Sequence, residues 1–337
     1  MTDLADWMKG IREQVDGRLD AYFSDKIAEA KALSPDSVEL VEGVRSLTMR
    51  GGKRFRPMMV EGGFRAIDPK GPADATTSAG ASLEVLQSYL LIHDDWMDQD
   101  DERRGGPAVH VMYRNRYEQH MANSLAVLAG DLASAYSLEL LMSSAGVNTD
   151  VLRVFLQIQK EVFFGQHLDI TQNAEVSRMH DLKTTSYTVR GPLLLGATLA
   201  GADAAQIEAL TAYANPLGEA FQLADDLLGT FGNQGDTGKP GNDLLHRKRT
   251  SLVAEAERLL PAGQRDALDA VMDGQTSDEN LAAASELLVT SGARANIEKR
   301  LHDRSEEAKA ALASASIDEG GKTILSGLAD RLAHRAY

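Results

Sequence analysis

Acidic side chains follow an apolar stretch in the segment YLLIHDDWMDQDDERRGG, residues 89–106. Asp94 and Asp98 are four residues apart, so a helix would place both carboxylates on one face, with Asp95 beside them. Like charges at this spacing destabilise an isolated helix unless a cation lies beside them. Carboxylate oxygens suit Mg²⁺, which also keeps water and substrate phosphate in its shell. By itself, the pattern is equally consistent with a solvated acidic helix end.

A second group of acids makes a metal site the better interpretation. The segment FQLADDLLGTFGN again ends an apolar run in adjacent acids, Asp225 and Asp226, and Asp169 lies in the apolar context FFGQHLDI. Carboxylates on different helices can hold metal ions when the helices face one another in a bundle. We therefore expect these acids and the first group to bind metal together.

Basic side chains stand close to both acidic groups in the sequence. The segment RGGKRFRP combines two glycines with Arg50, Lys53, Arg54 and Arg56. Such cations, with backbone amides and a helix N-terminus, bind diphosphate, and the G-x-x-x-x-G-K-[ST] spacing of an ATP-binding loop is absent. Further cations near the acidic groups are Arg103, Arg104, Lys183, Lys239 and Lys248. Each alone is more typical of a solvated surface, but their placement predicts two anionic ligands, one bridged by metal and one held by Lys and Arg alone.

Helices must position these residues, because helical periodicity dominates the sequence. The stretch ASLEVLQSYLLIHDDWMD places Leu83, Leu86 and Leu90 at spacings typical of a buried helical face. Alternating strand patterns are hard to find, and breaks such as ERRGGP and GNQGDTGKPGND separate the helical segments. We predict an all-α fold in which residues 1–337 form a single helical domain.

The composition narrows the functional classes. The formal net charge of −15 argues against a nucleic-acid partner, because phosphate backbones require a basic surface. The chain has no cysteine, which excludes disulfides, thiolate chemistry and cysteine-ligated zinc. The N-terminal segment lacks the features of a signal peptide, and no apolar run reaches the ~18 residues of a membrane span. We expect a cytoplasmic protein without a membrane span.

Taken together, the motifs resemble those of the trans-isoprenyl diphosphate synthases, the polyprenyl synthetase family. GGKRFRP, DDWMDQDDERRG, GQHLDI, KTT, FQLADD and GKPGNDLLHRKRT follow one another in the family's order between about Val44 and Leu252. The resemblance implies an all-α bundle around a large central cavity, usually as a homodimer. It also implies an enzyme that condenses isopentenyl diphosphate head-to-tail (1′-4) with an allylic diphosphate, using about three Mg²⁺ ions.

The resemblance also implies roles for individual residues. The metal-binding positions are matched by Asp94, Asp95, Asp98, Asp169, Asp225 and Asp226. Contacts to the allylic diphosphate are matched by Arg103, Lys183, Lys239 and Lys248, and contacts to isopentenyl diphosphate by Lys53, Arg56, Gln87 and Arg104. Thr184 and Gln222 match substrate-contacting positions beside the reacting carbon. The implied catalytic set is Asp94, Asp95, Asp98, Lys183, Thr184, Gln222 and Asp225.

Two positions depart from the family pattern, and a proline predicts an irregular helix. The second motif reads DDLLG, so Gly229 replaces its third acid, and metal binding there depends on Asp225 with help from Asp226. Arg247 stands where glycine is common in the family. Pro192 cannot donate a helical hydrogen bond, so we expect the helix to loosen near Thr188; an ordinary packing kink is the alternative.

The residues just before the first acidic motif set product length in the family. Tyr89 is five residues before Asp94, so on a helix it would lie about 7.5 Å below the metals and close the cavity. An aromatic side chain there argues against products of C30 and above, whereas Leu90 leaves more room than a second aromatic residue would. We favour geranylgeranyl diphosphate (C20) as the product, with farnesyl diphosphate (C15) as the alternative.

Other classes of protein share parts of this pattern. Class I terpene cyclases and head-to-head synthases use the same helical fold and aspartate motifs, but they lack an isopentenyl diphosphate site. A non-catalytic subunit of a heteromeric prenyl synthase typically loses motif aspartates, and Gly229 keeps this alternative open. A plain helical scaffold with acidic surfaces is the third alternative. Incubation with Mg²⁺, isopentenyl diphosphate and each allylic primer distinguishes them.

Overall fold

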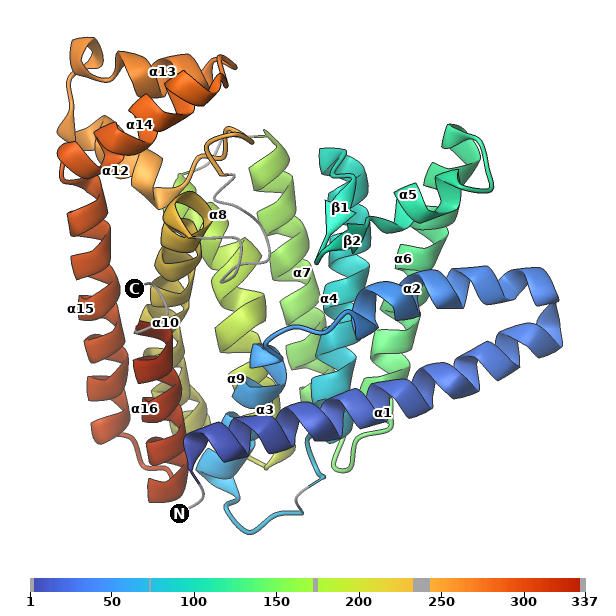
Figure 1. The fold of residues 1–337 in the computed structure, drawn as a ribbon. Coiled ribbons are helices and arrows are strands. Elements are labelled where there is room, and N and C mark those ends of the chain that lie inside the picture. Colours follow the sequence, from blue (N-terminus) through green and yellow to red (C-terminus); the bar gives the residue numbers. More distant parts are fainter. Residues whose placement is uncertain (1–2, 73, 172–174, 233–242, 334–337) are drawn as a thin grey trace. The chain divides into compact units, whose positions relative to one another are not determined.

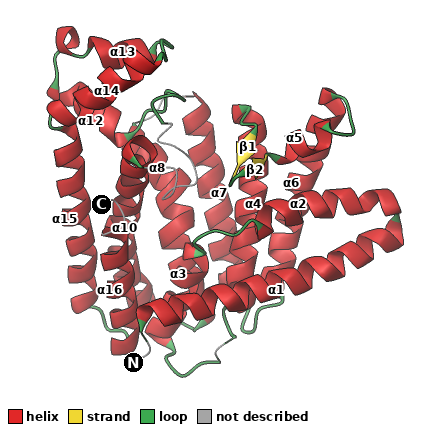
Figure 2. Ribbon diagram, in the orientation of Figure 1, coloured by secondary structure: helices red, strands yellow, loops and turns green. Residues whose placement is uncertain are grey.

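The computed structural model describes residues 3–72, 74–171, 175–232 and 243–333 (Figure 1). Helices make up almost all of the described chain (Figure 2), and its strands are the two short ones of a hairpin. The predicted all-α fold is confirmed. Residues group into two compact units, the first comprising 1–153 and 192–202 and the second 154–191 and 203–337. A single domain around a central cavity stays a prediction.

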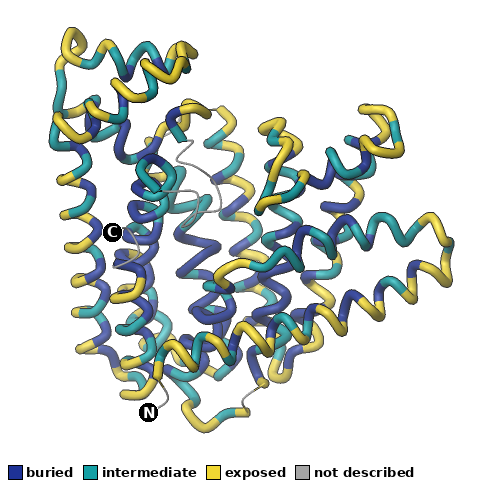
Figure 3. The backbone as a smooth tube through the Cα atoms, in the orientation of Figure 1, coloured by how far each residue is buried: buried dark blue, intermediate teal, exposed yellow. Residues whose placement is uncertain are grey.

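Unit 1 contains the first acidic motif. Its elements are α1 (Leu4–Leu33), the short helix η1 (Pro35–Ser37), α2 (Val38–Met49), α3 (Phe55–Ile67), α4 (Thr77–Asp98), β1 (Glu102–Arg103), β2 (Gly106–Pro107), α5 (Val109–Arg114), α6 (Gln119–Met142), the start of α7 (Thr149–Thr171) and most of α9 (Gly191–Leu199). Helices α4 and α6 pack side by side. Residues buried on α4 concentrate in its first three turns (Figure 3), so these turns form the support for the acidic end.

Unit 2 contains the second acidic motif. Its elements are the remainder of α7, α8 (Val176–His180), the π-helix η2 (Asp181–Arg190), α10 (Ala204–Phe231), α12 (Ser251–Leu259), the short helix η3 (Ala262–Gln264), α13 (Asp266–Met272), α14 (Asp278–Thr290), α15 (Ala293–Ala313) and α16 (Glu319–Ala333). Helices α10 and α15 pack side by side. One apolar core joins α10 to α12, α14 and α15, with Leu227, Leu252, Leu288 and Ile297 among its buried side chains.

Glycines allow helices of unit 1 to approach very closely. A Cβ atom at Gly63 on α3 would lie 2.1 Å from the backbone oxygen of Leu193 on α9, and one at Gly196 would lie 1.8 Å from the oxygen of Val60. Each helix thus places a glycine against the backbone of the other. Only a residue without a side chain permits this contact.

The helix before Pro192 is irregular, as predicted, but the irregularity is longer than expected. Residues Asp181–Arg190 form a π-helix, which ends two residues before this proline. The segment packs against two glycines of unit 2, because Gly165 on α7 lies against the backbone of Lys183 and Gly218 on α10 against the Thr185 side chain. π-helical turns inside α-helices are frequent at functional sites.

Helix α6 is apolar along most of its length. By length and composition it is the one helix of the described chain that could cross a membrane, yet 39% of its most apolar window is buried inside the structure. It packs against α4, α5 and α2. Four large apolar side chains of α6 are exposed: Met121, Leu128, Leu138 and Met142.

Candidate active site

The first acidic motif ends α4, where three aspartates have three different environments. Asp95 is fully buried, Asp94 is half-buried and Asp98 is exposed. Gln99 adopts a left-handed conformation with φ 58° and ends the helix directly after the motif. Carboxylates at a helix C-terminus are disfavoured by the helix dipole, so the motif needs compensating positive charge.

Arg103 supplies this charge from the hairpin. Its Nε donates to Asp95 Oδ1 at 2.6 Å, and its guanidinium also lies 3.1 Å from Asp100 Oδ2 and 3.8 Å from Asp94 Oδ2. The hairpin turns the chain back through Arg104 and Gly105, which have φ values of 52° and 70°. The structure therefore brings the predicted diphosphate ligand Arg103 to the aspartates.

Burial and neighbouring charges act in opposite directions on Asp95. Burial raises the pKa of its carboxyl group to about 6, with contributions from Asp94 and Asp100, while Arg103 opposes the shift. The Oδ2 atom of Asp95 is buried without a hydrogen-bond partner. An oxygen-only donor set with such an atom, beside the more accessible Asp94 and Asp98, fits a hard cation.

The described residues contain no preformed group of three acidic, histidine or cysteine side chains around one point. This is compatible with Mg²⁺, which is usually bound through one or two carboxylates, water and substrate phosphate rather than by an all-protein cage.

The basic residues of the loop between α2 and α3 differ in burial. Arg54 is 2% exposed and donates to Glu84 Oε2 at 2.6 Å and Asp16 Oδ1 at 2.8 Å. Arg50 donates to the backbone oxygen of Arg103 at 2.9 Å. The expectation that Arg50 and Arg54 help to hold diphosphate is wrong for Arg54, because its charge is buried and already paired. Lys53 is exposed and Arg56 is half-buried.

Arg104 links this loop to the acidic motif. Its Nη1 donates to the backbone oxygen of Gly51 at 2.8 Å, and its guanidinium would lie 3.7 Å from a Cβ at Gly52. The hairpin thus carries one arginine to the aspartates and the next to the basic loop. Gln87, half-buried on α4, is the remaining residue of the predicted isopentenyl diphosphate site.

Tyr89 and Leu90 are half-buried on α4, below the acidic motif. The Tyr89 ring packs edge-on against His93, with centroids 4.9 Å apart. His93 Nε2 lies 3.1 Å from the backbone oxygen of Val127 on α6. A Cβ atom at Gly130 would lie 2.2 Å from the same His93 nitrogen. The sequence reasoning missed His93, although its position directly before two acids and the glycine in AVLAGDL were the available signals.

In unit 2, the second acidic pair separates into one engaged and one more accessible side chain. Asp226 is 3% exposed, and its two oxygens accept hydrogen bonds from Gln222 Nε2 at 2.6 Å and from the backbone nitrogen of Ser251 at 2.7 Å. Asp225 is half-buried. Asp226 therefore positions Gln222 and the start of α12, and the more accessible Asp225 is a candidate metal ligand.

Asp169 and Lys183 form the second pairing of a predicted metal ligand with a predicted diphosphate ligand. Lys183 Nζ lies 2.5 Å from Asp169 Oδ2, and Thr184 is half-buried beside it in the π-helix. His180, which the sequence reasoning missed, is near this pair. Burial lowers the pKa of His180, and the charges of Asp226 and Asp169 oppose that shift.

The loop before α12 holds Lys248, while Lys239 lies outside the described residues. Lys248 Nζ is 3.7 Å from Asp243 Oδ1, and its side chain is exposed. Arg247 adopts a left-handed conformation with φ 54°. This conformation explains why glycine suits the position, since a side chain raises its energy.

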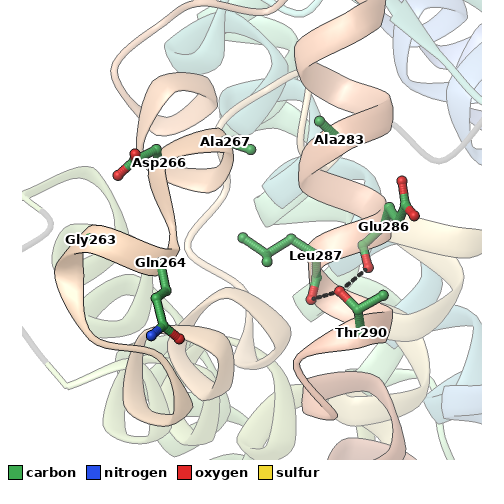
Figure 4. A pocket seen from close by; sticks show the side chains of 8 residues that line it. All are labelled: Gly263, Gln264, Asp266, Ala267, Ala283, Glu286, Leu287 and Thr290. Carbon is green, nitrogen blue, oxygen red and sulfur yellow. Dashed lines mark hydrogen bonds between the residues drawn. The ribbon is translucent and has the colours of Figure 1, made fainter.

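A hollow between α13 and α14 is a different kind of site (Figure 4). Its lining residues are Gly263, Gln264, Asp266, Ala267, Ala283, Glu286, Leu287 and Thr290. None of them is cationic and two are acidic, so the hollow does not suit a diphosphate.

Known proteins share both these motifs and this fold. Residues 38–288 match the model of the family described as polyprenyl synthetase. A short chain isoprenyl diphosphate synthase of Methanocaldococcus jannaschii is 30% identical over 291 residues, covering 83% of this chain and 82% of the relative. A (2E,6E)-farnesyl diphosphate synthase of Mycobacterium tuberculosis is 34% identical over 267 residues, covering 74% of this chain and 71% of the relative.

A solved structure is similar over nearly the whole chain. It is a geranylgeranyl pyrophosphate synthase of Corynebacterium glutamicum complexed with isoprenyl diphosphate and magnesium, with a TM-score of 0.87, 33% identity and coverage of 96% of this chain and 98% of the other. The chain belongs to the polyprenyl synthetase family. The family predicted from the sequence is confirmed, whereas the names of the relatives differ in product length.

The raised pKa of Asp95 predicts how stability depends on pH without metal. The folded protein holds this proton up to about pH 6 and the unfolded chain only to about 3.8, so Asp95 lowers stability as pH rises through that window. Relative to Asp95→Asn, the wild type should lose about 2 kcal/mol between pH 4 and pH 7. Denaturant unfolding at each pH measures the difference, with the exposed Asp6→Asn as control. A difference that does not change with pH would contradict the prediction.

Proposed function

We propose that this chain is a short-chain prenyl diphosphate synthase that condenses isopentenyl diphosphate head-to-tail (1′-4) with an allylic diphosphate. The hydrogen bond from Arg104 to Gly51 is the observation that carries the proposal, because it joins the basic loop to the hairpin of the acidic motif. Arg103 places one positive charge beside the aspartates. Arg104 and the loop that contains Lys53 form a second cationic group. Two such groups suit two diphosphates.

The same arrangement disfavours the alternatives. A terpene cyclase or head-to-head synthase has no use for an isopentenyl diphosphate site, which we assign to Lys53, Arg56, Gln87 and Arg104. A non-catalytic subunit typically lacks motif aspartates, whereas this chain retains the whole first motif and Asp225 of the second. The relatives named above are synthases.

We assign magnesium binding separately in each unit. In unit 1 the ligands are Asp94 and Asp98, with Asp95 held against Arg103; in unit 2 they are Asp225 and Asp169. When bound, Mg²⁺ would neutralise the charge that develops on the departing diphosphate. The solved relative with magnesium and isoprenyl diphosphate supports this assignment, and about three ions per site is our expectation for this family.

The protein's own cations serve the same purpose. We infer a role in diphosphate binding for Arg103 in unit 1 and, separately, for Lys183 and Lys248 in unit 2, since fixed positive charge stabilises a leaving anion without reorganisation of solvent. Gln222 is oriented by Asp226, and Thr184 lies in the π-helix, whose wider turn redirects backbone groups. The reaction requires that water be kept away, because water would otherwise capture the allylic cation. No side-chain base is required, because the departing diphosphate can take the proton.

We further propose that the protein is a homodimer. Met121, Leu128 and Met142 on α6 are 48%, 52% and 64% exposed and are separated by seven and fourteen residues, so they form one stripe along the helix. A second copy of this chain could bury such a stripe. Light scattering should give about twice the 36.4 kDa of one chain, and Leu128→Glu should shift it toward the monomer. A monomeric wild type at working concentration would contradict the proposal.

A cytoplasmic location stays a prediction.

Incubation with Mg²⁺, isopentenyl diphosphate and each allylic primer tests the proposed function. Radiolabelled isopentenyl diphosphate should enter a longer prenyl diphosphate, and chelation of the metal should abolish this, because the leaving group is no longer neutralised. Asp94→Ala should lower the rate by about 100-fold or more. Absence of product with every primer, in a protein that unfolds cooperatively, would refute the proposal.

Substitution of Tyr89 tests the proposed C20 product. Tyr89→Ala should shift the product to C25 or longer, since the ring that closes the cavity is removed about 7.5 Å below Asp94. Tyr89→Phe is the matched control and should keep the wild-type length, because the ring remains. Product length is read by mass spectrometry. If Tyr89→Ala changes only thermal stability, Tyr89 is a core residue and does not limit product length.

A further inference from the structure

Arg50 follows the last turn of α2, and its side chain contacts the hairpin that carries Arg103. Its Nη1 donates to the backbone oxygen of Arg103 at 2.9 Å. Gly106 is the partner of Arg103 across the hairpin, and a Cβ atom there would lie 2.9 Å from Cζ of Arg50. The Arg50 guanidinium therefore lies against both members of one strand pair, with a hydrogen bond to the first and a close contact with the second.

The second terminal nitrogen of Arg50 is held by two helices. Nη2 donates to Ser46 Oγ on α2 at 3.3 Å and to Met112 Sδ on α5 at 3.5 Å. Both terminal nitrogens are thus engaged by atoms of the protein, and the side chain is half-buried, whereas Lys53 in the same loop is exposed. A planar guanidinium held at both ends is suited to fixing the backbone that it bonds.

A reciprocal bond runs from the hairpin to the loop. Arg104 Nη1 donates to the backbone oxygen of Gly51 at 2.8 Å, so each segment donates an arginine to a backbone oxygen of the other. The backbone of Arg103 is therefore held next to α2. Its own side chain extends from this fixed point to Asp95, where Nε donates to Oδ1 at 2.6 Å.

We propose that Arg50 is a positioning residue, which holds the backbone of Arg103 so that the Arg103 guanidinium faces the first acidic motif and the allylic diphosphate. The proposal rests on the proposed function, because it concerns the diphosphate that we assign to Arg103. It gives Arg50 a different role from Lys53 and Arg56, which we assign to isopentenyl diphosphate. A misplacement of about 1 Å can lower a rate about 100-fold, so the backbone that carries such a cation must be held.

A double-mutant cycle tests whether Arg50 acts through Arg103. Arg50→Ala should lower kcat/KM for the allylic substrate by about tenfold. It should leave KM for isopentenyl diphosphate within about twofold of the wild type, because the bond from Arg104 to Gly51 remains. In an Arg103→Ala background, the same substitution should change kcat/KM by less than about twofold, since the side chain that it positions is absent.

The variant Arg50→Lys separates geometry from charge. Lysine keeps the positive charge but has a single terminal nitrogen, which cannot bond the Arg103 oxygen and also replace the contacts with Ser46 and Met112. Its kcat/KM should therefore stay about fivefold or more below that of the wild type. Recovery to within about twofold would show that Arg50 acts by its charge, as a diphosphate ligand does, and would overturn the proposal.

Arg45→Ala is the matched control. Arg45 lies on the same helix, but it pairs with Asp20 and Glu42 at the surface and not with the hairpin. Its loss removes one positive charge from α2 and should leave kcat/KM within about twofold of the wild type.

Thermal midpoints give a readout that does not depend on turnover. Each variant is measured without ligand and with Mg²⁺ plus inorganic diphosphate, which raise the midpoint if they bind the folded protein. Arg50→Ala and Arg103→Ala should each reduce this increase, and the double variant should reduce it no further. The ligand-free midpoint reports separately how much the contacts of Arg50 with α2 and α5 stabilise the fold. If Arg50→Ala does not fold, Arg50→Lys takes its place in the cycle.

The outcomes distinguish this inference from the proposed function. If product forms but Arg50→Ala has no effect, or has the same effect with and without Arg103, Arg50 does not act through Arg103 and the inference is wrong. If the wild type forms no product with any primer, the proposed function fails, while the midpoints still test the link between Arg50 and Arg103. A wild type that neither forms product nor responds to magnesium and diphosphate would refute both.

Discussion

The pairing of an acidic motif with a cation from a later segment is the interaction on which each part of the site depends. Buried carboxylates without compensation would destabilise the fold, because burial disfavours charge. In unit 1 the hairpin returns Arg103 to Asp95, and in unit 2 the π-helix directs Lys183 to Asp169. In each pair, the proposed metal ligand and the proposed diphosphate ligand hold each other in place before either ligand binds. In both pairs the cation follows the acid in the chain, and a short connection folds the cation back onto the acid.

Glycines provide the space for these pairs. Gly165 lets the backbone of Lys183 approach α7, Gly218 accommodates Thr185, and Gly130 accommodates His93 below the first motif. At each position a methyl group would displace a residue of the site or its direct neighbour. The glycines lie inside helices, where they cost stability relative to alanine. Their contribution is therefore close approach between segments and not flexibility.

The fold class and the main site residues could be predicted because they depend on local patterns. Helical periodicity identified α4 and α10, and acidic pairs at the ends of their apolar runs identified Asp94 and Asp225. Which member of each pair is buried could not be predicted, because Asp95 and Asp226 are oriented by partners outside their own helices, Arg103 in the hairpin and Ser251 at the start of α12. The π-helix was foreseen only as an irregularity near Pro192, since its length depends on packing against α7 and α10.

The buried position of Arg54 changes how substitutions in the loop GGKRFRP should be interpreted. Three basic residues lie within four positions, but Arg54 joins α1 and α4 through Asp16 and Glu84 and has a left-handed backbone, φ 48°. Loss of its charge would leave Glu84 buried without its partner. Such a change lowers the stability of the folded protein more than it lowers affinity for a ligand. Diminished turnover after replacement of a basic residue here is thus ambiguous by itself. Lys53 and Arg56 can be recognised as substrate ligands only where the amount of folded enzyme is unchanged, and Arg54 belongs to the architecture that presents them.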